Sequence, residues 1–305
     1  MPIVQANGLN IFYEDSGPED GPVVLMVMGL ALQLIAWPQD MINDLNSAGF
    51  RTIRFDNRDI GLSEKIKGKK APNVIWQVLL SKLGIRTKAP YLLTDMATDT
   101  IGLADALGIG QFHLVGLSMG GMISQIVAAE HPDRVKSFTA IMTSTQNPRL
   151  PGTRADVAKA MAAAGKPNAT SEDRIDQQLG IWNLIGTKDG GSSQGELRHQ
   201  LSVAYERNFS AAGIIRQTSA IVATGDLRKW TRRITAPTLV IHGTADPLVH
   251  VERGKDIAAI IPGAKLHLIE DMGHDLPPKH LDTVTNLTLE HVQQSQTASD
   301  TRPVA

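Results

Sequence analysis

The sequence predicts an α/β fold, with a mostly parallel sheet of eight strands, helices on both faces of the sheet and a helical cap inserted late in the chain. The first observation is a regular alternation of segments with strand and helix character. The second is that some strand segments, such as residues 23–27, are continuous apolar runs, which is typical of strands buried on both faces. The third is that the alternation stops between residues 144 and 233 and then resumes.

The elements follow in order along the chain. Asn7-Gly8, a strong two-residue turn signal, joins the first two strands in a hairpin. The predicted strands are 3–6, 10–14, 23–27, 51–55, 112–115, 135–142, 238–242 and 265–269. The predicted helices have apolar residues at helical spacing and cover 37–48, 95–107, 118–130, 252–260 and 281–293. Strands that alternate with helices in this way predict right-handed βαβ units.

The domain organisation follows from where this pattern breaks. We expect a core of residues 1–143 and 234–293, a helical cap or lid of residues 144–233, and a disordered tail of residues 294–305. The cap segment contains several prolines and a Gly-Ser-rich loop, and the tail is polar. The cap should therefore lie over one end of the sheet.

Composition excludes several classes of function. The chain of 305 residues has 42% hydrophobic and 20% charged residues, a net charge of -1 and no cysteine. It can therefore have no disulfide, no thiolate zinc site and no cysteine nucleophile, and its charge shows no footprint for nucleic acid. No apolar run is long enough to span a membrane, and from the first ten residues we expect no signal peptide. We expect a cytoplasmic protein with no metal and no cofactor.

The nucleophile is predicted by the motif G-x-S-x-G at residues 116–120, with Ser118 at its centre. The motif lies between a predicted strand and a predicted helix, the context that this pattern requires. A sharp strand-to-helix turn strains the serine backbone and leaves no room for side chains at the flanking glycines. The turn projects the hydroxyl from the end of the sheet, at the positive end of a helix. The alternative is a serine that only caps that helix.

The partners of the serine are predicted from chain order and position. A serine hydroxyl needs a base and an acid that orients the base, and in this arrangement the order along the chain is Ser, acid, His. Asp246 follows the strand 238–242, and His274 follows the strand 265–269. Both therefore lie at the carboxyl edge of the sheet, with Ser118. The alternatives are a turn for Asp246-Pro247 and a surface loop for His274.

Two backbone N–H groups should bind the oxyanion. One belongs to Met119, directly after the nucleophile, and we assign the other to Leu30 in the loop after the strand 23–27. Gly29 permits a close approach of that loop. The alternative is an ordinary glycine-containing loop. The substrate pocket is predicted to include Met28, Gly29, Trp37, Trp182 and Phe209. The cap aromatics among them could equally be ordinary packing residues.

These motifs resemble the α/β-hydrolase superfamily over about residues 8–292. The resemblance rests on Met-Gly-Leu at 28–30, Asp-Asn-Arg-Asp-Ile-Gly-Leu-Ser at 56–63, Gly-Leu-Ser-Met-Gly-Gly at 116–121, Gly-Thr-Ala-Asp-Pro at 243–247 and Met-Gly-His at 272–274. The Met-Gly pair, Trp37-Pro38 and the stretch at 56–63 look most like the aclacinomycin methylesterase group, which implies esterase activity. Most members of the superfamily have His at position 28 and Gly at position 59, and we interpret Asp59 as structural.

The sequence thus predicts a serine carboxylesterase whose substrate is a small-molecule ester with a hydrophobic acyl or alcohol part, cleaved through an acyl-enzyme on Ser118. The first alternative is another chemistry on the same triad, that of a cofactor-free perhydrolase of the haloperoxidase type or of a carbon–carbon hydrolase. The second is a non-catalytic receptor of this fold. A homodimer is left open.

Overall fold

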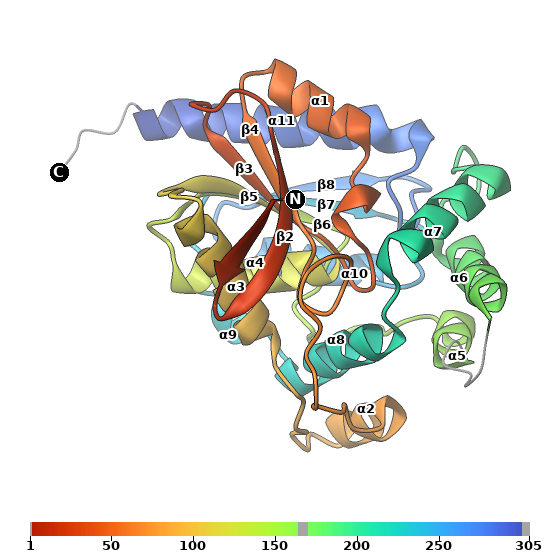
Figure 1. The fold of residues 1–305 in the computed structure, drawn as a ribbon. Helices are drawn as coiled ribbons and strands as arrows, with labels where there is room; N and C mark the ends of the chain where they lie inside the picture. The colour runs from red at the N-terminus through yellow and green to blue at the C-terminus, as the bar shows by residue number, and fades with distance from the viewer. Residues whose placement is uncertain (1, 164–169, 301–305) are drawn as a thin grey trace.

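The computed structural model describes residues 2–163 and 170–300, and it has the predicted fold. The sheet has the order β1-β2-β4-β3-β5-β6-β7-β8, and Figure 1 shows it running through the molecule. The strands are β1 (Ile3–Ala6), β2 (Leu9–Ser16), β3 (Val23–Val27), β4 (Arg51–Phe55), β5 (Phe112–Leu117), β6 (Val135–Ile141), β7 (Thr238–Gly243) and β8 (Lys265–Ile269). The hairpin β1–β2 joins β4 in antiparallel pairing, and all later neighbours pair in parallel.

Helices cover both faces of the sheet (Figure 1). One face packs against α1 (Gln39–Ser47) and α11 (Pro278–Asp300), and the other against α3 (Leu93–Ala106), α4 (Met119–Glu130) and α10 (Val251–Ile260). The helix predicted from residue 37 is α1, which begins two residues later than expected, and a short 3₁₀ helix, Leu34–Ala36, lies before it. The cause is Pro38, which precedes the first turn of α1 and cannot lie inside a helix.

The disordered tail predicted from residue 294 is wrong as far as Asp300. Helix α11 continues to that residue, and Val292 is fully buried in it. Its last turns are held by polar contacts with the sheet, because the Gln296 Oε1 atom lies 3.1 Å from His113 Nε2 and 3.0 Å from Lys136 Nζ. A polar segment can therefore be ordered without an apolar face of its own. Residues 301–305 lie outside the described residues.

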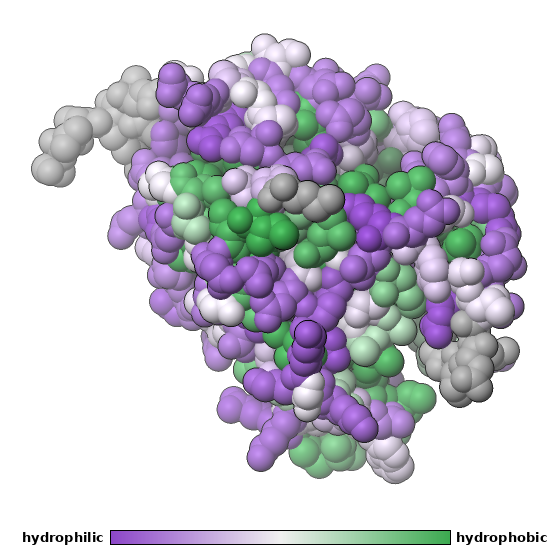
Figure 2. All heavy atoms as spheres, viewed as in Figure 1, coloured by the Kyte–Doolittle hydropathy of each residue, from purple (hydrophilic) through white to green (hydrophobic). Residues whose placement is uncertain are grey.

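The insertion between β6 and β7 is helical, as predicted. It contains α5 (Ala155–Ala163), α6 (Ser171–Ile185), α7 (Gln194–Asn208), α8 (Ala211–Thr224) and the short α9 (Arg228–Thr231). Helices α5 to α8 lie to one side of the sheet in Figure 1, whereas α9 packs on α4. A further helix, α2 (Val74–Lys82), follows β4 and packs against α8. In Figure 2, apolar side chains lie at the surface of the lower end of the molecule, where Figure 1 has α2.

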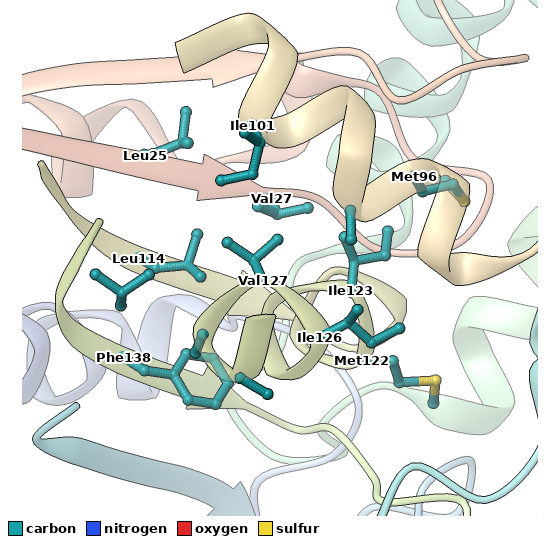
Figure 3. Close-up of a cluster of buried hydrophobic side chains, with 14 of the residues drawn as sticks. Leu25, Val27, Met96, Ile101, Leu114, Met122, Ile123, Ile126, Val127 and Phe138 are labelled. Atoms are coloured by element: carbon teal, nitrogen blue, oxygen red, sulfur yellow. The ribbon is translucent and has the colours of Figure 1, made fainter. Parts of the chain in front are cut away.

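The core that positions the site is built around α4. In Figure 3, Ile123 and Val127 of α4 lie against Val27 of β3 and Leu114 of β5, with Ile101 of α3 alongside. Eleven of the twelve residues of α4 are buried. This packing fixes the first turn of α4, which follows directly after Ser118, relative to the carboxyl ends of the strands. Of the described helices, none is long and apolar enough to cross a bilayer.

Candidate active site

Ser118 lies in the sharp turn between β5 and α4, and its backbone has φ 52° and ψ -118°. This conformation is strained for a residue with a side chain, and the surrounding contacts hold it. The Ser118 N–H donates to the Ile141 carbonyl oxygen at 2.9 Å, and the Thr143 hydroxyl donates to the Ser118 carbonyl oxygen at 2.6 Å. A Cβ atom at Gly120 would lie 1.9 Å from the Val27 carbonyl oxygen, so only glycine fits there. The turn thus presses the start of α4 against the end of β3.

The three predicted triad residues meet at this edge of the sheet. Nε2 of His274 lies 3.0 Å from Oγ of Ser118, and Nδ1 of His274 lies 2.6 Å from Oδ2 of Asp246. His274 and Asp246 are buried, and Ser118 is half-buried. These are hydrogen-bond distances, and the order is the one in which an imidazole can take a proton from the serine while the carboxylate holds the imidazole.

The environment of Asp246 favours its ionised form. Burial opposes ionisation, but the neighbouring His274 and His242 outweigh it and lower the pKa of Asp246 below its usual range. Its other oxygen, Oδ1, accepts the N–H groups of Leu248 and Val249 at 2.9 and 2.8 Å. The carboxylate is thus fixed at both oxygens, and its charge is available to an imidazolium at His274.

His242 is a neighbour of this carboxylate that the sequence did not predict. Its Nε2 atom lies 2.7 Å from the Val249 carbonyl oxygen and 3.5 Å from Asp246 Oδ2. Since a carbonyl oxygen can only accept, Nε2 carries the proton and donates. His242 therefore closes the loop 246–249 around the carboxylate. In the described chain, no three His, Cys, Asp or Glu side chains are grouped so that they could hold a metal ion.

The loop that carries His274 is bonded to the cap, which sequence reasoning also missed. The His274 N–H donates to the carbonyl oxygen of Ile185, the last residue of α6, at 2.7 Å. The Thr187 hydroxyl accepts the Gly273 N–H at 2.9 Å and donates to Asp275 Oδ1 at 2.7 Å. Burial raises the pKa of Asp275, and the two hydrogen bonds from Thr187 oppose that rise. The position of the predicted base thus depends on the cap as well as on the sheet.

The predicted oxyanion donors lie beside the serine. Met119 is the first residue of α4, and a Cβ atom at Gly29 would lie 3.3 Å from the Cβ atom of Ser118, so the loop with Leu30 passes close to the nucleophile. Within the described residues, neither the Leu30 N–H nor the Met119 N–H has a hydrogen-bond acceptor. Their role as oxyanion donors stays a prediction.

The predicted pocket residues fall into two groups. Met28 and Trp37 are fully buried in the apolar cluster that also contains Leu117, directly before the nucleophile. Trp182 is half-buried on α6. Phe209 stacks on Tyr205 with ring centroids 5.0 Å apart. These contacts leave the pocket assignment of Met28, Trp37, Trp182 and Phe209 a prediction, whereas Gly29 lies directly against Ser118.

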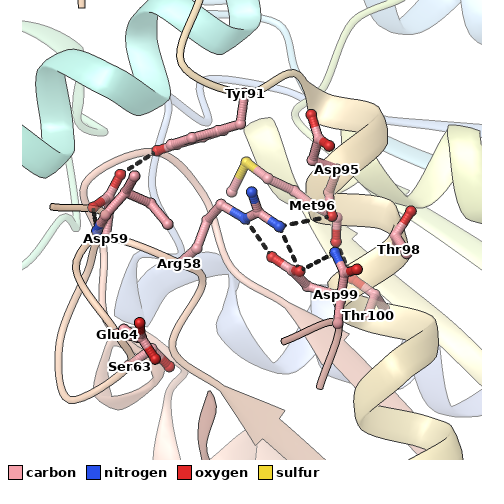
Figure 4. A network of polar contacts seen from close by, with 12 residues as sticks. Arg58, Asp59, Ser63, Glu64, Tyr91, Asp95, Met96, Thr98, Asp99 and Thr100 are labelled. Atoms are coloured by element: carbon pink, nitrogen blue, oxygen red, sulfur yellow. Dashed lines mark hydrogen bonds and ion pairs between the residues drawn. The ribbon is translucent and has the colours of Figure 1, made fainter. Parts of the chain in front are cut away.

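Asp59, interpreted as structural, joins the core to the cap. Its carboxylate is fully buried, accepts two hydrogen bonds from Arg216 of α8 at 2.6 and 2.8 Å, and accepts the Tyr91 hydroxyl at 2.7 Å. Burial and the charge of Asp59 raise the pKa of Tyr91, so the phenol stays protonated and donates. Figure 4 shows the hydrogen bond between Tyr91 and Asp59. It also shows a second buried ion pair of the segment 56–63, between Arg58 and Asp99.

A second link of the same kind starts from Asp56. The Asp56 carboxylate accepts the Leu34 N–H at 2.8 Å and lies 2.7 Å from Arg207 Nη1 of α7. Two acidic residues of the stretch 56–63 therefore each hold one cap helix by an ion pair. The arginines were not singled out in the sequence, since nothing in their spacing relates them to residues more than 150 positions away.

Comparison with known proteins agrees with this geometry. The family described as "alpha/beta hydrolase fold" matches residues 22–280. Rhodomycin D methylesterase DauP of Streptomyces sp. (strain C5) is 25% identical over 279 residues, which cover 85% of this chain and 87% of the relative. A non-heme chloroperoxidase of Streptomyces lividans is 26% identical, with 91% and 94% covered. The crystal structure of the enol-lactonase from Burkholderia xenovorans LB400 superposes with a TM-score of 0.75 at 23% identity, with 96% and 100% covered. The predicted resemblance to a methylesterase group is thereby confirmed.

Proposed function

The chain belongs to the α/β-hydrolase family, and from this membership we propose that it is a serine carboxylesterase that cleaves an ester with a hydrophobic acyl or alcohol part. The observation that carries the proposal is the continuous hydrogen-bonded series from Ser118 through His274 to Asp246, at 3.0 and 2.6 Å. The methylesterase relatives support an ester as the substrate. The chain neighbours of Ser118, Leu117 and Met119, are apolar and buried, which supports a hydrophobic substrate.

The mechanism that this geometry supports has two halves. Oγ of Ser118 attacks the ester carbonyl carbon while His274 Nε2 takes the hydroxyl proton, and the Leu30 and Met119 N–H groups bind the oxyanion. His274 then protonates the departing alcohol, which leaves an acyl-enzyme on Ser118. A water molecule, deprotonated by His274, attacks the acyl carbon and releases the acid and the free serine. Asp246 stabilises the imidazolium in both halves.

The test is covalent labelling by a fluorophosphonate, together with hydrolysis of p-nitrophenyl esters of increasing acyl length. Ser118→Ala should abolish labelling and lower kcat by at least about 10⁴-fold, because it removes the attacking atom and leaves the rest of the site. Ser171→Ala, a change of the same kind at an exposed position on α6, should leave both unchanged. Labelling that persists in Ser118→Ala would remove Ser118 from the mechanism.

A second candidate function is supported by the chloroperoxidase relative, which matches nearly the whole chain. The same triad could form a peracid from a carboxylic acid and hydrogen peroxide, which then oxidises bromide. Peroxide-dependent bromination that exceeds ester hydrolysis under matched conditions would favour this activity. A wild-type chain that takes no label and hydrolyses no ester would instead indicate a non-catalytic receptor.

A further inference from the structure

Helix α2 exposes apolar side chains and buries a polar one. Ile75, Trp76 and Leu79 are 59%, 64% and 46% exposed, and the only buried residue of the helix is Gln77. The Gln77 side chain donates to the Lys88 carbonyl oxygen at 2.9 Å, so it closes the following loop back onto the helix. A helix that packs on a globular core has the opposite arrangement, with its apolar side chains inside. Packing within this chain therefore does not account for the composition of α2.

The apolar exposure is concentrated at this helix and the turn after it. Of the eleven large apolar residues that are exposed in the described chain, six lie within residues 75–85. We call these six residues the α2 patch: Ile75, Trp76, Val78, Leu79, Leu83 and Ile85. Contiguous apolar surface of this kind marks an interaction site. The α2 patch is the apolar area at the lower end of the molecule in Figure 2. In Figure 1, which has the same view, α2 lies at this end, outside α8.

The charged residues of the segment that carries the patch have one sign. Residues 65–88 contain seven lysines and arginines and no acidic residue, in a chain with 30 basic and 31 acidic residues overall. Six of these cations are exposed, and none of the six is in an ion pair within the described residues. They are Lys67, Lys69, Lys70, Lys82, Arg86 and Lys88. The partner should therefore be both apolar and negatively charged.

The helix itself is well formed, so the exposed side chains have a defined orientation. The Asn73 side chain caps it and accepts the N–H groups of Ile75 and Trp76. With nine residues it is too short to span a bilayer. Exposed apolar side chains together with basic residues near both ends are typical of a helix that lies in the plane of a membrane interface.

We propose that the α2 patch docks this protein on an anionic lipid bilayer. The apolar side chains enter the boundary between headgroups and acyl chains, Trp76 lies at headgroup level, and the six cations lie against lipid phosphates. A second copy of the chain fits less well, because a symmetric contact through α2 would bring both sets of six cations together. Nucleic acid would explain the charge but not the apolar patch. The surface is separate from the triad, so the proposal does not depend on the proposed function.

The test is flotation of the full chain with vesicles of phosphatidylcholine alone and of equal parts phosphatidylcholine and phosphatidylglycerol. The wild type should bind the anionic vesicles at low salt and be released at high salt. The variant Ile75→Ser/Leu79→Ser/Leu83→Ser should bind at least about tenfold more weakly, since three apolar side chains no longer enter the interface. The variant Lys67→Gln/Lys69→Gln/Lys70→Gln should bind on the order of a hundredfold more weakly, at about fivefold per cation.

Matched controls make the same changes elsewhere on the surface. Val203→Ser/Leu266→Ser/Leu268→Ser removes three other exposed apolar residues, and Lys159→Gln/Lys188→Gln/Lys279→Gln removes three other exposed cations. Both should bind as the wild type does, and circular dichroism with thermal melting checks that every variant is folded. Absence of wild-type binding to anionic vesicles, or binding that survives both α2 variants, overturns the proposal. A lipid-free dimer in sedimentation equilibrium that the apolar α2 variant dissociates would assign the patch to self-association and overturn it too.

Discussion

Two helices of this molecule, α4 in the core and α7 in the cap, are held in opposite ways. Eleven of the twelve residues of α4 are buried, whereas none of the fifteen residues of α7 is. Apolar packing on both sides fixes α4, and with it the turn at Ser118. Helix α7 is instead held by polar bonds to core loops, such as Arg207 with Asp56, and Gln33 Nε2 with the Asn208 carbonyl oxygen at 2.9 Å.

The difference shows that the core and the cap of this fold are stabilised by different kinds of contact. A site that needs its reacting atoms within hydrogen-bond distance is placed where close packing allows no alternative arrangement. The cap is attached in part by buried polar links, each of which one substitution can remove. The loop of His274 is held by both the core and the cap. It follows β8 of the core and is also bonded to Ile185 and Thr187 of the cap. Three substitutions test this division, one in the core, one in the cap and one at the point of contact.

The largest effect is expected in the core, at Asp246. Asp246→Asn keeps the shape but loses the charge that stabilises an imidazolium at His274, and its amide can donate to Nδ1 and hold the wrong tautomer. We expect kcat for a p-nitrophenyl ester to fall by about 10⁴-fold while the fold is retained. A loss below tenfold would contradict the assignment of Asp246 as the orienting acid.

Asp246→Asn should also change how the free energy of unfolding depends on pH. Since the pKa of Asp246 is lower in the folded state, its ionisation stabilises the fold above the unfolded value of about 3.9. This contribution is lost as the pH falls through the lower folded value. Urea unfolding of wild type and Asp246→Asn should therefore differ by a constant free energy at neutral pH and converge toward acid. A difference that grows toward acid would contradict the direction of the shift.

A substitution in the cap should lower the free energy of unfolding rather than the rate of ester hydrolysis. Arg216→Met leaves the fully buried Asp59 carboxylate with the Tyr91 hydroxyl and the Ile66 N–H but without its counter-charge. Loss of one partner of a buried pair should lower the free energy of unfolding by about 3 kcal/mol. The measurement is urea unfolding at neutral pH.

The control is an ion pair of the cap that lies in water. Arg198 pairs with Glu172 and Asp176 and is 41% exposed, so Arg198→Met should cost less than about 1 kcal/mol. Equal costs for the two variants would mean that the buried link does not hold α8 on the core, and the comparison between core and cap would lose its main support.

The same division explains what could be predicted from the sequence. Buried parallel strands are continuous apolar runs, and catalytic groups follow their carboxyl ends, so β3, β5 and the positions of Ser118, Asp246 and His274 could be read from local patterns. The cap anchors Arg207 and Arg216 could not, because an ion pair between residues more than 150 positions apart leaves no periodic signal.

The end of α11 was mistaken for a disordered tail for a related reason. Its composition from residue 294 is polar, and the contacts of Gln296 are made with side chains of β5 and β6, far away in the chain. His242 was missed because its role depends on the fold of the loop 246–249 around Asp246, which spacing does not show. Polar contacts that depend on the tertiary fold are thus the common element of what was not predicted.

The smallest effect, and the finest test of the division, is expected at Thr187, where core and cap meet. Thr187→Val keeps the volume but removes the hydroxyl that accepts the Gly273 N–H and donates to Asp275. Thr187 would act as a positioning residue for His274, so we expect kcat to fall by about tenfold, equal to about 1.4 kcal/mol in the activation free energy, with KM unchanged. Thr218→Val removes a hydroxyl of α8 that bonds only within its own helix, at the Ile214 carbonyl oxygen, and should change neither constant. If Thr187→Val alters KM alone while Thr218→Val changes neither constant, the cap serves only to bind substrate, and the base is positioned by the sheet without it.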